Sequence, residues 1–85
     1  MVNLKYNTMY TMTINRYNEQ TRNYGQYAHE QLTAEDVQLV IDHFKDKPVV
    51  EGFYQLVLQS KESTVTFYTC HGDILGYLKA NHKPQ

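Results

Sequence analysis

A chain of 85 residues can bury one hydrophobic core but not two, so we expect a single small domain spanning residues 1–85. Its hydrophobic fraction of 41% is ordinary for a globular protein, and eight Tyr and three Phe supply large side chains that disordered chains lack. Eight Lys and Arg against nine Asp and Glu leave a formal net charge of -1. This balance excludes a strongly basic surface for phosphate backbones or anionic membranes.

The sequence contains no pattern typical of export or membrane insertion. Residues 1–16 alternate polar and apolar positions and lack the continuous apolar stretch of a secretory signal. The longest aliphatic run is residues 39–41, far below the roughly 20 residues that span a bilayer. The single Cys70 excludes an internal disulfide and mildly favours a reducing compartment. We therefore expect a cytoplasmic protein.

The first third of the chain predicts a β-hairpin. Tyr6, Tyr10, Met12 and Ile14 occupy even positions while polar residues occupy most odd ones, a period of two that is typical of a half-buried strand. A polar segment, residues 17–23, follows, and the Tyr-rich stretch from Tyr24 to His29 is expected to pair back onto the first strand.

The segment after this hairpin predicts an amphipathic helix. Thr33 is the expected N-cap, because its hydroxyl can accept a hydrogen bond from the free amide near Asp36. One apolar stripe follows at helical spacing, and Pro48 prevents the helix from continuing. The stripe consists of Val37, Val40, Ile41 and Phe44.

Two segments rich in β-branched and aromatic residues, Gly52–Ser60 and Thr64–Cys70, predict a second hairpin around a short polar turn. An even number of loop residues places apolar side chains opposite each other on one face. The predicted pairs are Leu58 with Val65, Leu56 with Phe67, and Tyr54 with Thr69. We expect Val40, Ile41, Leu56 and Phe67 to be among the most buried residues.

A short C-terminal helix is expected after Asp73, with Ile74, Tyr77 and Leu78 on one side. The predicted fold is therefore α+β, with an antiparallel four-stranded sheet, one central amphipathic helix and a short C-terminal helix in the order β-β-α-β-β-α. The central helix should cover the more apolar face of the sheet.

No pattern in the sequence favours catalysis or a cofactor. Cys70 and His71 are adjacent, and adjacent residues of a strand point to opposite faces, so they do not form a nucleophile–base pair. The histidines do not occur at metal-ligand spacing, and the glycines do not form a phosphate-binding loop. We expect no enzymatic activity, no cofactor and no metal.

The abundance of tyrosine leaves two hypotheses for function. The first is a protein-binding module, because Tyr brings a large contact area at low entropic cost. The Asn-, Gln-, Tyr- and Lys-rich usage suggests an AT-rich genome, and we consider a phage or mobile-element accessory protein that inhibits a host enzyme. The alternative is a single-stranded nucleic-acid-binding protein that stacks bases on a Tyr-rich sheet. A small enzyme ranks third.

The sheet face opposite the central helix is the expected contact surface. Met9, Phe53, Val57 and Tyr68 are predicted to form an apolar strip on it if the first and third strands are neighbours, and Tyr17 and Tyr24 are further candidates. Such a strip would bind a protein partner or a second copy of the chain. An equally weighted alternative is that Ile74, Tyr77 and Leu78 cover the strip within the monomer.

Overall fold

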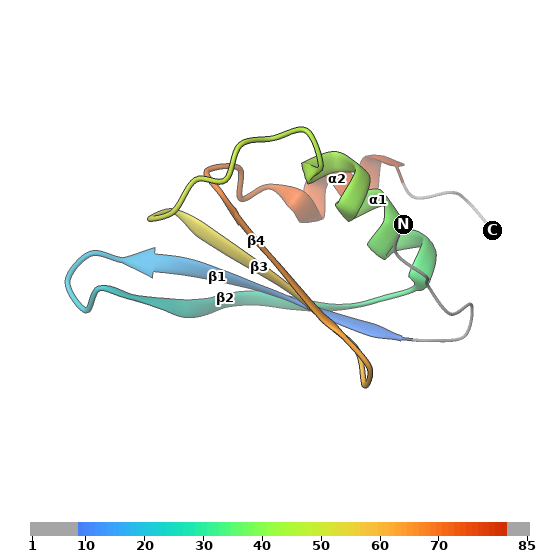
Figure 1. The fold of residues 1–85 in the computed structure, drawn as a ribbon, viewed down its shortest axis with the longest axis horizontal. Coiled ribbons are helices and arrows are strands. Elements are labelled where there is room, and N and C mark those ends of the chain that lie inside the picture. Colours follow the sequence, from blue (N-terminus) through green and yellow to red (C-terminus); the bar gives the residue numbers. More distant parts are fainter. Residues whose placement is uncertain (1–8, 82–85) are drawn as a thin grey trace.

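The computed structural model describes residues 9–81 and has the expected α+β architecture (Figure 1). Its elements follow the order β-β-α-β-β-α. They are β1 (Tyr10–Asn18), β2 (Asn23–Leu32), α1 (Ala34–Phe44), β3 (Tyr54–Gln59), β4 (Thr64–Thr69) and α2 (Ile74–Asn81). The four strands form one antiparallel sheet in the order β2-β1-β3-β4, and both helices lie on the same side of it.

The first hairpin is shifted along the chain relative to the sequence prediction. Strand β1 continues beyond Ile14 to Asn18, while residues 6–8 of the predicted strand lie outside the described residues. Asn18 begins the connecting turn, and its Oδ1 accepts hydrogen bonds from the backbone N–H groups of Gln20 at 2.8 Å and Thr21 at 3.2 Å. Hydrogen bonds to the Asn18 side chain, rather than apolar contacts, therefore hold the polar turn between β1 and β2. The predicted pairing of residues 24–29 with the first strand is confirmed.

Helix α1 begins as predicted, because the backbone N–H of Asp36 donates to the Thr33 hydroxyl at 3.2 Å. Its buried side chains, Val37, Val40 and Phe44, belong to one core cluster with residues of β1 and β3. Opposite them, Met12 and Ile14 of β1 and Leu56 and Leu58 of β3 are also buried.

The second hairpin has the predicted register. Leu58 pairs with Val65, Leu56 with Phe67, and Tyr54 with Thr69. The expectation of deep burial is confirmed for Val40 and Leu56, each with 0% of its surface exposed, but it is wrong for Ile41 and Phe67. These two are partly buried and pack against the core from its margin. Ile41 flanks the buried helical stripe, and Phe67 belongs to the edge strand β4, where its ring stacks on Phe44 with centroids 5.5 Å apart.

Helix α2 returns to the same side of the sheet as α1, where Ile74 and Leu78 join the single core cluster (Figure 1). The short connection from β4 to α2 passes close to Tyr54. A Cβ on Gly72 would lie 2.5 Å from the Tyr54 ring, so this position requires a residue without a side chain. Because α2 lies on the same side of the sheet as α1, the alternative in which Ile74, Tyr77 and Leu78 cover the opposite face is wrong.

Candidate functional site

The face of the sheet opposite the helices, which we call the open face, is not covered by any described helix (Figure 1). Because residues paired in an antiparallel sheet share a face, the register defines its members as three rows across four strands and a shorter fourth row. The rows are Gln31, Thr11, Gln59 and Thr64; His29, Thr13, Val57 and Thr66; Gln26, Asn15, Gln55 and Tyr68; and Tyr24 and Tyr17.

Three of the predicted contact residues meet at one end of the open face. The ring of Tyr24 lies edge-on to Tyr17, with centroids 5.1 Å apart, and edge-on to Tyr68 at 5.8 Å. The Tyr24 hydroxyl accepts a hydrogen bond of 2.8 Å from the backbone N–H of Gly52. Tyr24 therefore reaches across the sheet from the edge strand β2 and links the loop before β3 to both other rings.

Two amide side chains connect these rings to the centre of the sheet. Asn15 Nδ2 donates to Gln55 Oε1 at 2.8 Å, and Gln55 Nε2 donates to the Tyr68 hydroxyl at 3.0 Å. Both bonds are partly buried. We call Asn15, Tyr17, Tyr24, Gln55 and Tyr68 the tyrosine–amide cluster. Its side chains are all half-buried and are held by one another, which fixes their orientation before any partner arrives.

The other predicted contact residues do not join this cluster into one apolar strip. Met9 and Phe53 are large exposed side chains, but Met9 precedes β1 whereas Phe53 lies beside Tyr17 at the other end of that strand. Val57 is central, and polar Gln55 separates it from Phe53 along β3. Gln55 therefore interrupts the predicted strip, although β1 and β3 are neighbours as the strip required. Alternation along β3 brings glutamines to the same face as Val57.

The chemistry of the open face is uncharged. None of the described residues that the register places there is Lys, Arg, Asp or Glu. Its one histidine, His29, lies with Nδ1 3.0 Å from Gln26 Nε2. Sequence reasoning missed Asn15 and Gln55 because their bond joins strands 40 residues apart, and only the sheet register brings them together.

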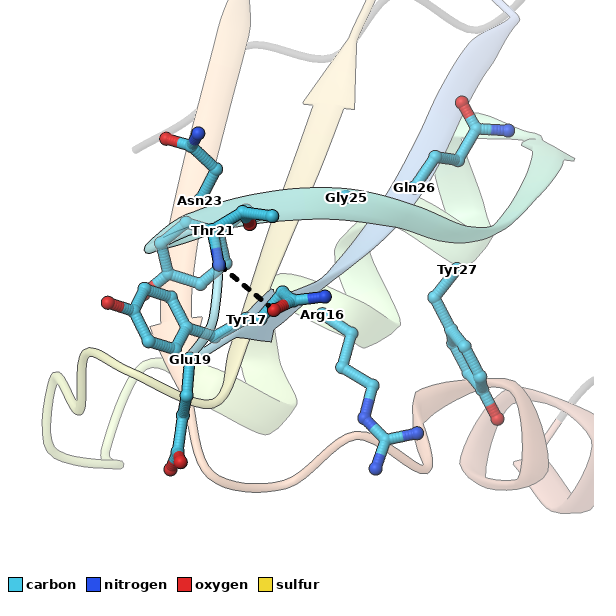
Figure 2. Close-up of a pocket in the computed structure, with 10 residues that line it drawn as sticks. Arg16, Tyr17, Glu19, Thr21, Asn23, Gly25, Gln26 and Tyr27 are labelled. Carbon is cyan, nitrogen blue, oxygen red and sulfur yellow. Dashed lines mark hydrogen bonds between the residues drawn. The ribbon is translucent and has the colours of Figure 1, made fainter.

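The turn end of the β1–β2 hairpin forms a second exposed surface, with a shallow depression around Gly25 (Figure 2). Arg16 and Tyr27 extend to one side of the strands there, while Asn23 and Gln26 extend to the other. Tyr27 is 59% exposed, and its ring contacts Tyr54 edge-on at 6.4 Å. Arg16 and Tyr27 belong to residue types that often anchor protein interfaces.

The described residues include no group of three or more His, Cys, Asp or Glu side chains placed to hold a metal ion. Cys70 is an exposed free thiol. Within residues 9–81, neither helix has the length and apolar character needed to cross a bilayer.

Comparison of the chain with protein-family models, with curated proteins and with solved structures finds no match.

Proposed function

We propose that this chain is a protein-binding module that meets its partner with the open face of its sheet, centred on the tyrosine–amide cluster. The observation that carries the proposal is the chemistry of that face. It combines three tyrosines with amides, threonines and one valine, and its described residues include no Lys, Arg, Asp or Glu.

The lack of charge favours a protein partner because docking removes the central part of a surface from water. Burying an unpaired charge costs several kcal/mol, and the cores of protein interfaces are accordingly depleted in Lys, Glu and Asp and enriched in Tyr. Hydroxyl and amide groups can instead exchange hydrogen bonds with water for hydrogen bonds with the partner.

The existing contacts of the cluster also support binding. An exposed Tyr loses rotamer freedom when it is trapped in an interface, which costs about 0.5–1.5 kcal/mol for each immobilised side chain. Tyr24 and Tyr68 already lose much of this freedom in the free protein, through the Gly52 and Gln55 hydrogen bonds. The remaining cost of ordering them on binding is smaller.

Single-stranded nucleic acid is the second candidate, because aromatic rings on an open sheet face are a known platform for stacked bases. The charges argue against it. Nucleic-acid affinity depends strongly on Lys and Arg that contact phosphates, and the described part of the open face offers neither.

Inhibition of a host enzyme by a phage or mobile-element protein stays a prediction, as does a cytoplasmic location. Self-association through the same face is a form of the proposal that light scattering distinguishes. A concentration-dependent increase in mass would identify a second copy of the chain as the partner.

The test compares Val57→Glu with the control Gln38→Glu on the exposed side of α1. After affinity capture and mass spectrometry identify a partner, its purified form is titrated against each variant by calorimetry. Val57→Glu should weaken binding at least about tenfold, because it buries a carboxylate in the interface. Gln38→Glu should bind like the parent. Equal affinities for parent and Val57→Glu would contradict the proposal, and so would micromolar, salt-sensitive binding to oligonucleotides by the free protein.

A further inference from the structure

A cavity on the helix side of the molecule lies between the end of α1 and the start of α2. Three basic side chains from three segments line it: His43 from the last turn of α1, Lys47 from the following loop, and His71 from the connection between β4 and α2. We propose that this cavity binds a phosphate-type oxyanion through His43, Lys47 and His71.

The three basic groups line one pocket, where the charges of Lys47 and His71 act on His43. None of them forms a salt bridge with a described acidic residue. The His43 ring lies against the Tyr77 ring of α2, with centroids 4.1 Å apart and planes inclined by 34°, which fixes the direction of its nitrogens. A doubly charged anion in this cavity would interact favourably with the Lys47 ammonium and with His43 when it is protonated.

The electrostatics of His43 agree with this arrangement. Its pKa is lowered from the ordinary value of 6.5, first by desolvation and then by the positive charges of Lys47 and His71. An anion held between these groups would reverse the effect of the two charges. Binding should therefore raise the pKa of His43 and become tighter as the pH falls and His43 takes up a proton.

Asp73 is the acidic residue in the lining. Its carboxylate is turned over the first turn of α2, where a Cβ on Gly76 would lie 2.7 Å from Asp73 Oδ1. The charges that shift the pKa of His43 are those of Lys47 and His71. The aromatic rings that lie against His43 are those of Phe44 and Tyr77.

The test is an NMR titration of the histidine ring signals in sodium sulfate, with sodium chloride at the same ionic strength as the reference. Sulfate keeps its charge throughout the range, so any pH dependence belongs to the protein. We expect sulfate to raise the pKa of His43 by about half a unit or more. His29, which is exposed on the open face, is the internal control and should not respond. A response of His29 as large as that of His43 would overturn the proposal.

Variants and a second set of probes sharpen the result. Lys47→Gln should weaken sulfate binding at least tenfold, while Lys61→Gln, in the exposed turn between β3 and β4, should bind like the parent. Unchanged binding by Lys47→Gln that is folded by circular dichroism would overturn the proposal. Inorganic phosphate and O-phosphoserine then distinguish free phosphate from a phosphomonoester group, since the tighter of the two identifies the source of the oxyanion.

Discussion

The two faces of this sheet are built from the same four strands, yet they differ in the interactions that organise them. On the covered face, Met12, Ile14, Leu56 and Leu58 are almost fully buried against α1 and α2. On the open face, side chains one residue away are amides, hydroxyls and tyrosines that remain partly or fully exposed. The covered face holds the fold together through apolar burial, whereas the open face is organised by specific hydrogen bonds and ring contacts.

This difference shows that specific contacts order the open face although it does not form a second hydrophobic core. A solvated sheet face requires only polar side chains, and Thr11, Thr13 and Gln59 meet that requirement. The tyrosine–amide cluster does more than keep the face solvated, because it orients large rings at the surface. Changes on the two faces should therefore separate stability from binding.

The largest contrast is expected between Leu58→Glu and Val57→Glu, the same charge placed on neighbouring residues of β3. Leu58 is 2% exposed and faces the core, so its replacement by Glu should cost more than about 4 kcal/mol and unfold much of the protein. Val57 lies on the open face, and its replacement should leave the circular dichroism spectrum and a cooperative melt intact. If both variants unfolded, the open face would be part of the core.

Truncation of the covered face should show where its centre lies. Leu56→Ala should reduce the free energy of unfolding by about 2–5 kcal/mol in urea denaturation, because Leu56 is 0% exposed. Ile41→Ala should cost less than half as much, since Ile41 is only partly buried at the flank of α1. Equal losses for the two variants would contradict a core that is centred on β1 and β3 and has Ile41 at its margin.

A smaller loss is expected from Tyr24→Phe, which removes the hydroxyl that accepts from Gly52 but keeps the ring. One hydrogen bond of this kind contributes about 1 kcal/mol. Tyr27→Phe is the matched control because Tyr27 is highly exposed and its hydroxyl has no described hydrogen-bond partner. Urea denaturation that found no difference between the two variants would show that the Tyr24 bond does not order the open face.

The smallest effect is expected in the pH dependence of the free energy of unfolding, through His43 on the helix side. Because the pKa of His43 is lowered in the folded state, the unfolded chain binds a proton at this position first as the pH falls through 6.5. The free energy of unfolding should therefore decrease in that window and level off once folded His43 is also protonated. His43→Gln should show a shallower decrease. Urea denaturation between pH 8 and 5.5 with identical slopes for parent and variant would contradict this contribution.

Much of the covered face could be predicted from local sequence. The Thr33 cap and the apolar stripe of α1 depend on neighbours within a few residues, and the β3–β4 register follows from the length of one short loop. The side of the sheet taken by α2 could not be predicted in this way, because its apolar positions fit either face.

The open face was harder to predict because its contacts are distant in sequence. The bond between Asn15 and Gln55 and the contact between Tyr24 and Tyr68 require the order β2-β1-β3-β4 and the sheet register. A register shift between Ile14 and Asn15 also changes which residues of β2 share a face, and no local pattern marks it. The sequence could therefore indicate the tyrosines as candidates but not their assembly.

Hydroxyl-radical footprinting of the tyrosines, with and without the captured partner, tests the central claim most directly. Oxidation of Tyr17, Tyr24 and Tyr68 should fall when the partner binds, because the partner covers the tyrosine–amide cluster. Tyr77 packs on the helix side and should react equally in both states. Protection of Tyr77 with unchanged oxidation of the three open-face tyrosines would place the partner on the helices and contradict the account.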